Sequence, residues 1–238
     1  MDVDMAEAGF SSARQTMVER QLRPWQVLDE RVLAALGAVP REDFVPQARR
    51  HSAYADLAVP LGVEAGSAQH SLLPPNVCGR ALQSLALRGD ERVLILGDAS
   101  GYLGACAARL GGRVLCLEAD PQLAAAMAAR FAALGIDAAE ARHGDALRDG
   151  LPVVEEGDGD DCWDAVLVAA TLAEAPGDWL ARLAGGGRLF AILGDPRAAV
   201  MTATLISRVG QRDWRREGLF ETRAPALQAG PAKVEFCF

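Results

Sequence analysis

The stretch "VLILGDASGYLG", residues 93–104, decides the fold of this 238-residue chain. A run rich in Val, Leu and Ile ends at Gly97, Gly101 follows after three residues, and Gly104 lies in an Ala-rich segment typical of a helix. A strand that passes through a small-residue turn into a helix presents free backbone N–H groups to a polar or anionic ligand. The stretch therefore predicts a ligand site at the end of a buried strand.

Strands and helices alternate on both sides of this stretch. We expect strands over 92–96, 113–118, 138–142, 164–169 and 187–193, with helices over 76–88, 101–110, 121–134 and 176–184. Short apolar strands alternating with helices predict a parallel sheet with helices on both faces. Two further extended runs joined by "GQRD" predict an antiparallel hairpin at the end. The sequence thus predicts a mainly parallel seven-stranded sheet in one α/β domain, residues 1–238.

The first 75 residues have a different pattern. Two amphipathic helices are expected between residues 11 and 50, the first with Ser11 or Ser12 as N-cap and the second with Asp29. From residue 51 to 80 prolines and small residues exclude a long helix. Long irregular segments of compact domains are often binding loops, so we expect a functional role for this one.

Composition excludes several classes of protein. The net charge of −8 argues against a broad nucleic-acid surface, and the basic cluster at 212–218 is interpreted as a solvated strand edge. No apolar run approaches the roughly 20 residues of a membrane helix, and the acidic N-terminus does not resemble a signal peptide. Five scattered Cys and three distant His have no metal-ligand spacing. We therefore expect a cytoplasmic protein without metal, nucleic acid or membrane partners.

Acidic residues follow the next two strands. Glu118 ends "RVLCLEAD", about 20 residues beyond the glycine turn, where a carboxylate can accept hydrogen bonds from ribose hydroxyls. Asp145 in "HGDA" follows the next strand and can accept a hydrogen bond from an adenine amino group. The alternatives are a helix-capping acid before Pro121 and a Gly-Asp turn. Because the chain lacks GxGxxG and GxxxxGK[ST], we expect adenosine without a diphosphate, and S-adenosylmethionine is the leading ligand.

Several segments together resemble the protein-L-isoaspartate O-methyltransferase family. The opening "MVERQLRPWQVLDERVLAALGAVPREDFVP" (17–46) is the most specific, and "SAYADLAVPLG", "SGY", "HGD", "WDAVLVAA" and "LARLAGGGRLFAILG" follow in the family's order. The resemblance implies a Rossmann-like S-adenosylmethionine-dependent methyltransferase fold. It also implies methylation of the carboxylate of an abnormal aspartyl residue in a damaged protein. Residues 1–75 would then be helices and substrate loop, and 76–238 the cofactor-binding core.

The resemblance also implies site residues. The cofactor-binding set is Gly97, Asp98, Ala99, Gly101, Glu118, Ala119, Asp145 and Ala146. The family's loop resembles "GQTISQP", with hydroxyls that face the substrate, where this chain has "AQHSLLPP" (68–75). If the two segments are aligned at Pro75, Ser71 corresponds to the family's threonine and is the catalytic hydroxyl, and Leu73 corresponds to the family's serine. If they are aligned at Gln69 instead, His70 and Leu72 correspond to the threonine and the serine.

The chain departs from the family at three positions. Ile95 stands where the family has an acid, Ala99 where it has a glycine, and Leu73 where Pro75 anchoring aligns a hydroxyl. An alternative is therefore a non-catalytic or altered-substrate relative that keeps the fold. Because Leu73 would present an apolar wall to a substrate carboxylate, we expect weak or absent transfer to isoaspartyl peptides. Asp98 is a conjectural replacement for the missing acid.

Overall fold

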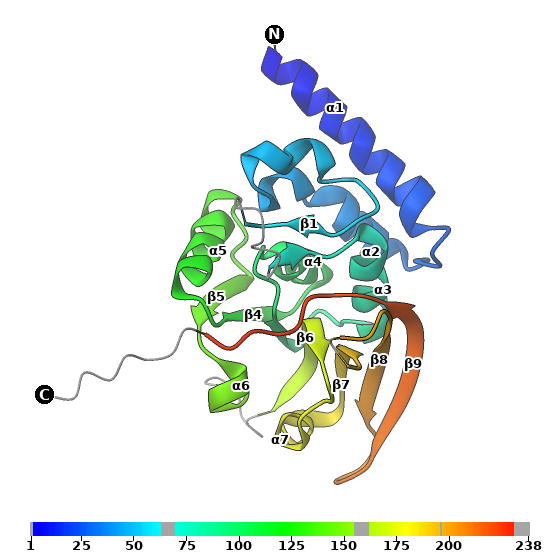
Figure 1. The fold of residues 1–238 in the computed structure, drawn as a ribbon, viewed down its shortest axis with the longest axis vertical. Coiled ribbons are helices and arrows are strands. Elements are labelled where there is room, and N and C mark those ends of the chain that lie inside the picture. Colours follow the sequence, from blue (N-terminus) through cyan, green and yellow to red (C-terminus); the bar gives the residue numbers. More distant parts are fainter. Residues whose placement is uncertain (1, 63–69, 155–161, 196, 231–238) are drawn as a thin grey trace, which may run out of the picture.

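The structure is a computed structural model that describes residues 2–62, 70–154, 162–195 and 197–230. Gln69 and most of the acidic loop around 155–161 lie outside these ranges. Figure 1 shows one central sheet with the N-terminal helices stacked over one side of it. Among the described residues, no helix combines the length and the apolar character that crossing a membrane requires.

Seven strands form the sheet in the order β5-β4-β3-β6-β7-β8-β9. Neighbouring strands from β5 to β7 are parallel, and β7–β8 and β8–β9 are antiparallel. The prediction of a mainly parallel seven-stranded sheet with an antiparallel C-terminal strand is confirmed. The strands are β3 Arg92–Leu96, β4 Arg113–Glu118, β5 Ala139–His143, β6 Trp163–Leu172, β7 Leu183–Leu193, β8 Met201–Arg208 and β9 Trp214–Thr222.

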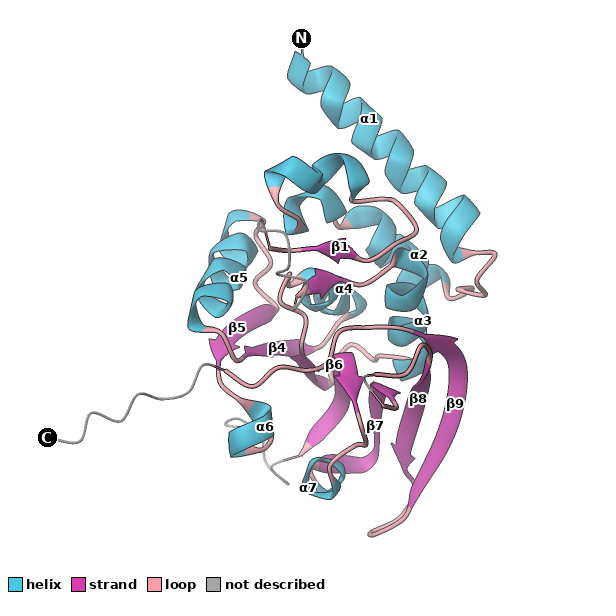
Figure 2. Cartoon of the chain, viewed as in Figure 1, coloured by secondary structure: helices cyan, strands magenta, loops and turns pink. Residues whose placement is uncertain are grey.

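Both faces of the sheet are buried, and successive residues of β3 supply both cores. Val93 and Ile95 belong to the cluster beneath the N-terminal helices, whereas Leu94 and Leu96 belong to the cluster on the opposite face. Figure 2 shows the helices that flank the sheet. They are α3 Pro75–Leu85, α4 Tyr102–Leu110, α5 Pro121–Ala133, α6 Ala146–Asp149 and α7 Gly177–Ala181.

The N-terminal region differs from expectation at its beginning. Helix α1 runs through Asp2–Met17, so the prediction of Ser11 or Ser12 as N-cap is wrong. The preceding "DVDMAEAG" contains several Ala, Glu and Met residues, good helix formers that continue the helix toward the N-terminus. Asp29 does cap α2, since its side chain accepts a hydrogen bond from the backbone N–H of Arg31.

Short elements connect this region to the sheet. A two-stranded antiparallel sheet, β1 with β2, lies between the upper helices and the main sheet (Figure 2). Propensity alone does not predict strands of two residues. The remaining bounds are η1 Val18–Leu22, α2 Glu30–Ala38, η2 Arg41–Phe44, η3 Gln47–Ser52, β1 Val59–Pro60 and β2 Ser71–Leu72.

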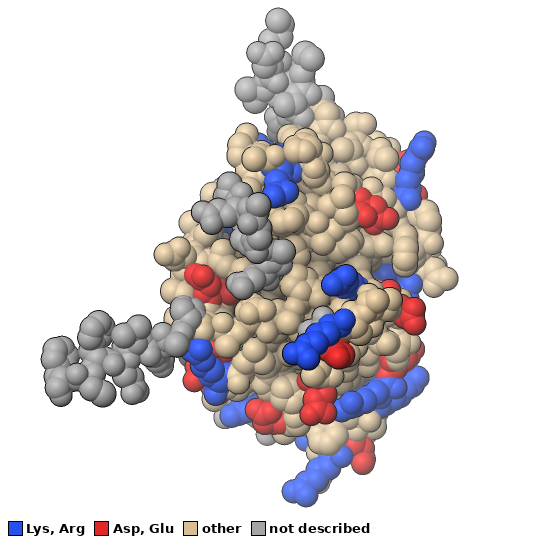
Figure 3. Space-filling view, in the orientation of Figure 1, with Lys and Arg blue, Asp and Glu red and all other residues tan. Residues whose placement is uncertain are grey.

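The basic cluster 212–218 lies largely on β9, the edge strand of the sheet. Residues 215–218 are exposed, and Arg215 pairs with Glu217 at 3.3 Å. Figure 3 shows blue and red side chains close together along this side of the molecule. The interpretation of the cluster as a solvated strand edge is confirmed.

Candidate active site at the carboxyl edge of the sheet

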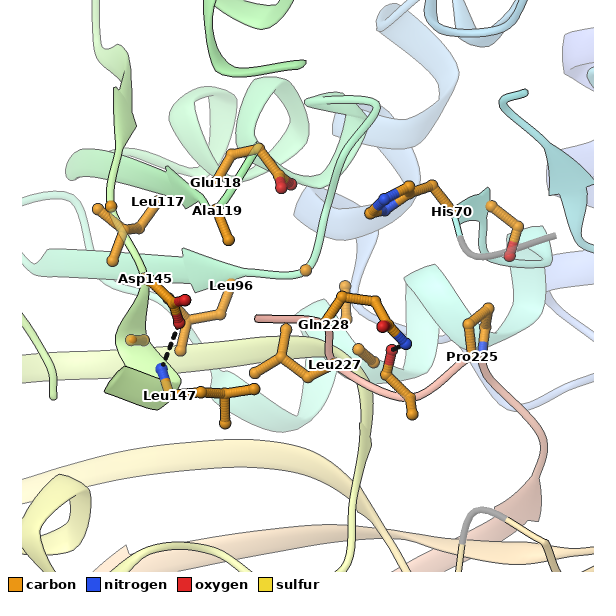
Figure 4. Close-up of a pocket in the computed structure, with 17 residues that line it drawn as sticks. His70, Leu96, Leu117, Glu118, Ala119, Asp145, Leu147, Pro225, Leu227 and Gln228 are labelled. Carbon is orange, nitrogen blue, oxygen red and sulfur yellow. Dashed lines mark hydrogen bonds between the residues drawn. The ribbon is translucent and has the colours of Figure 1, made fainter. Parts of the chain in front are cut away.

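A pocket opens where β3, β4, β5 and β6 end (Figure 4). Its empty volume is about 520 Å³, which includes space open to solvent. Parallel strands bring their carboxyl ends to one edge, which is where ligands bind in such sheets. Six of the nine residues predicted for the site line it: Ser71, Gly97, Glu118, Ala119, Asp145 and Ala146.

Glu118 is directed into this pocket. Its side chain is 5% exposed, and its Oε1 accepts a hydrogen bond from the backbone N–H of Asp120 at 3.0 Å. Burial raises the pKa of the Glu118 carboxyl above its ordinary value, while hydrogen bonding and the nearby His70 oppose the shift. Asp120, not Glu118, caps α5. The helix-capping alternative for Glu118 is therefore wrong, and Figure 4 shows its carboxylate facing His70 across the cavity.

Asp145 has a structural task at the same edge. Its Oδ1 accepts hydrogen bonds from the backbone N–H groups of Leu147 and Arg148 at 3.1 and 3.3 Å, so it caps α6. Its Oδ2 accepts one from the N–H of Gly230 at 2.8 Å. The turn-forming alternative is thus part of its role, although the side chain also lines the pocket.

Residues 225–228 form one wall of the pocket, and no pattern in the sequence predicts this. The backbone N–H of Thr171 on β6 donates to the carbonyl of Pro225, and the N–H of Leu227 donates to the carbonyl of Thr171. Leu227 and Gln228 consequently lie over the cavity in Figure 4. The run "APALQAG" has no strand periodicity, so only its pairing with a strand more than 50 residues earlier places it there.

The turn after β3 places three predicted residues away from the pocket surface. Asp98 is buried, and its carboxylate accepts hydrogen bonds from the N–H groups of Leu103 and Gly104 at 2.7 and 3.2 Å. It therefore holds the first turn of α4, favoured there by the helix dipole, and burial raises the pKa of its carboxyl. Ala99 and Gly101 are also buried and do not line the cavity.

The substitutions Ile95 and Leu73 are core residues. Ile95 is 1% exposed and Leu73 is 2% exposed, and both belong to the cluster under the N-terminal helices. The predicted apolar wall at Leu73 is therefore wrong, because the side chain packs inward. Asp98 likewise serves α4, which leaves the conjecture that it replaces an acid without structural support.

His70 and Ser71 are the loop residues that face the pocket. The Ser71 hydroxyl is buried and has no hydrogen-bond partner among the described residues. A buried hydroxyl without a partner is costly, and a ligand that accepts its hydrogen bond removes that cost. Anchoring on Gln69 cannot be compared directly, because that residue lies outside the described ranges.

Comparison with known proteins identifies the family. The model of the family "Protein-L-isoaspartate(D-aspartate) O-methyltransferase (PCMT)" matches residues 12–211. The chain belongs to this family. A protein-L-isoaspartate O-methyltransferase of Rhodopseudomonas palustris is 36% identical over 214 residues, which cover 90% of this chain and 92% of that protein. Another, from Anaeromyxobacter sp., is 35% identical over 217 residues, covering 91% and 84%.

Solved structures of family members share the fold. A Plasmodium falciparum protein-L-isoaspartate O-methyltransferase, crystallised with S-adenosyl-L-homocysteine, superposes with a TM-score of 0.71 at 20% identity, covering 92% of this chain and 98% of that one. A second protein-L-isoaspartate O-methyltransferase gives a TM-score of 0.75 at 22% identity, covering 91% and 66%. The resemblance in the sequence is confirmed over nearly the whole chain.

Proposed function

We propose that the protein is an S-adenosylmethionine-dependent methyltransferase that acts on the carboxylate of isoaspartyl residues in proteins or peptides. Family membership supports the reaction class. The observation that carries the proposal is one pocket lined by two carboxylate residues at adjacent strand ends and by Ser71, whose buried hydroxyl has no hydrogen-bond partner among the described residues.

The residues of the pocket suit the adenosine part of the cofactor. Glu118 offers acceptor oxygens for ribose hydroxyls, and Asp145 offers one for an amino group. Gly97 and Ala119 leave space near the strand ends because their side chains are small. A ligand of cofactor size needs several hundred Å³, and the empty volume of about 520 Å³, open to solvent in part, can hold one.

When bound, the cofactor supplies an electrophilic methyl group on a positively charged sulfur. Glu118 and Asp145 would hold its adenosine part, and the methyl group that it would supply could convert a substrate carboxylate to a methyl ester, leaving the cofactor as a neutral thioether. The nucleophile is already ionised at neutral pH, so no protein base is needed. The task of Ser71 is to donate a hydrogen bond to the second carboxylate oxygen and fix its orientation.

Transfer of labelled methyl to an isoaspartyl peptide tests the proposal, with the same peptide containing ordinary aspartate as control substrate. We expect transfer only to the isoaspartyl peptide. Ser71→Ala should lower kcat/KM by roughly 10-fold to 100-fold, since a hydrogen bond to a charged group contributes about 1.5–3 kcal/mol.

Ser84→Ala is the matched control, because the Ser84 hydroxyl donates within α3 to the carbonyl of Ala81 and does not line the pocket. Its transfer rate should equal that of the wild type. Binding of S-adenosylhomocysteine without transfer to any isoaspartyl peptide would instead favour the non-catalytic relative.

A further inference from the structure

Arg41 has an unusual environment for an arginine. It begins η2 and is 0% exposed. Its Nε donates a hydrogen bond to the carbonyl of Ala53 at 2.6 Å, and an Nη donates to the carbonyl of Leu73. The other Nη lies 3.8 Å from the Cys78 sulfur, and the guanidinium carbon lies 4.9 Å from the centre of the Tyr102 ring.

This buried cation has no acidic partner. Within the described part of the chain, no Asp or Glu forms an ion pair with Arg41. Two carbonyl groups and one aromatic face compensate only part of the cost of removing a charge from water. Apolar residues often replace buried charges without loss of stability. Stability alone is therefore a weak reason for an arginine at this position.

The groups that Arg41 holds explain its presence better. Ala53 precedes β1 and Leu73 follows β2, so one guanidinium binds the chain on both sides of the β1–β2 pair. Ser71 begins β2 and lines the pocket. Pro74 and Pro75 follow at once and fix the backbone into α3. The Leu73 carbonyl is thus a rigid anchor two residues from the substrate-facing hydroxyl.

The fourth contact connects this loop to the cofactor side. Tyr102 is the first residue of α4 and directly follows the turn at 97–101. It is 0% exposed, and its ring packs edge-on against Phe44, which ends η2. The guanidinium therefore contacts both Leu73, which directly follows β2, and Tyr102, which begins α4.

We propose that Arg41 is a positioning residue for methyl transfer: it fixes the β1–β2 pair, and with it Ser71, relative to the turn between β3 and α4. The inference rests on the proposed function, because alignment matters only if an acceptor and a methyl donor meet in this pocket. Displacement by about 1 Å can cost roughly 100-fold in rate. Arg41 itself lies outside the pocket lining.

Arg188 provides a matched control for a merely structural role. Its guanidinium also bridges separate segments, donating from Nε to the carbonyl of Leu85 at 2.8 Å and from Nη1 to Glu91 at 2.6 Å. Leu85 ends α3 and Glu91 precedes β3, so these contacts lie at the amino end of the strands, away from the pocket. Arg188→Met leaves Glu91 without its ion-pair partner and should therefore destabilise the fold.

The test compares Arg41→Met, Arg41→Lys and Arg188→Met by unfolding in urea, by titration with S-adenosylhomocysteine, and by kcat and KM at a temperature where all variants are folded. We expect Arg41→Met to lower kcat by about 100-fold while S-adenosylhomocysteine affinity stays within about threefold of wild type. Arg41→Lys should retain part of the rate, because a lysine ammonium can donate to one of the two carbonyl groups but cannot reproduce the planar guanidinium that binds both. Arg188→Met should lose stability and keep kcat.

Two results would overturn the proposal: an unchanged kcat in Arg41→Met, or a parallel loss of kcat and S-adenosylhomocysteine affinity. If Arg41→Met does not fold, the same quantities are compared between Arg41→Lys and Arg188→Met. Amide hydrogen exchange separates failure of this inference from failure of the proposed function. Exchange in β1 and β2 should rise in both Arg41 variants and stay unchanged in Arg188→Met, whether or not the wild type transfers methyl groups.

Discussion

Glu118 is buried and lines the pocket, and this sets how the affinity of the protein for an adenosine ligand should depend on pH. Burial raises the pKa of its carboxyl, so protonation begins at a higher pH than for an exposed glutamate. Ribose hydroxyls donate to the ionised form. Affinity for S-adenosylhomocysteine should therefore be constant above the raised pKa and fall as the pH drops through it, which titration calorimetry at several pH values can measure.

Substitution of Glu118 tests whether this residue causes the binding and its pH dependence. Glu118→Ala should weaken S-adenosylhomocysteine binding at least about tenfold, since one or two charge-assisted hydrogen bonds are lost. Glu118→Gln should lose less affinity and also lose the part of the pH dependence that the carboxyl causes. Wild-type affinity in a folded Glu118→Ala protein would remove this residue from the site.

The site residues that the sequence could predict are those at strand ends. Glu118 and Asp145 are found because an apolar run shows where a strand stops, and parallel strands stop at one edge. The direction of a side chain within a turn follows from backbone angles and local hydrogen bonds. The sequence therefore does not reveal that the Asp98 carboxylate accepts hydrogen bonds from the first turn of α4. The prediction that Leu73 faces the substrate is wrong for a similar reason, because a shift of one residue along an extended segment changes which side chain points into the core.

At the scale of elements, close packing explains why the stretch 93–104 has a third glycine, Gly104, inside helix α4. A Cβ at this position would meet the Cys116 sulfur on β4 and lie 3.1 Å from Cζ of Phe131 on α5. Gly104→Ala should therefore destabilise the protein by about 1–3 kcal/mol through overpacking, despite the better helix propensity of alanine. The unfolding free energy in urea measures the effect.

Gly37→Ala is the matched control, since Gly37 lies inside α2 and its added Cβ would make only an ordinary 3.6 Å contact with Val18. Here the gain in helix propensity should dominate, with stability unchanged or raised by up to about 1 kcal/mol. Equal effects at the two glycines would show that α4 can move away from β4 at little cost.

Periodicity predicted the regular elements well and the short ones poorly. The bounds of β3 and β4 agree with the expected 92–96 and 113–118, because buried apolar runs are distinct from their polar flanks. The β1–β2 pair was missed, since two-residue strands have no period to detect. Arg41 was missed as well. Its role depends on carbonyl groups of Ala53 and Leu73 that come together only in the folded chain.

At the scale of the whole molecule, one hydrophobic cluster joins the N-terminal helices to the sheet. It extends from Met17 on α1 to Ala224 after β9. Residues 1–75 and 76–238 should consequently unfold together. We expect a single urea transition, with far-ultraviolet circular dichroism coinciding with tryptophan fluorescence. The fluorescence reports from both regions, because Trp25 is near α2 and Trp179 is in the opposite core.

A substitution in the N-terminal part tests this coupling. Leu36 on α2 is fully buried, so Leu36→Ala should cost about 2–5 kcal/mol and shift both probes by the same amount. A fluorescence transition that separates from the circular dichroism transition would instead indicate two independently folding parts.

The chain end at the pocket also decides how the protein should be handled. Residues 225–228 form one wall of the cavity, and the amide of Gly230 is bonded to Asp145. An affinity tag fused after residue 238 would follow Gln228, which lines the pocket, by only ten residues of chain. Helix α1 begins at the top of Figure 1, beyond the N-terminal helices and away from β4 and β6. Purification handles, surface-immobilisation anchors and fluorescent fusions are therefore best attached at the N-terminus.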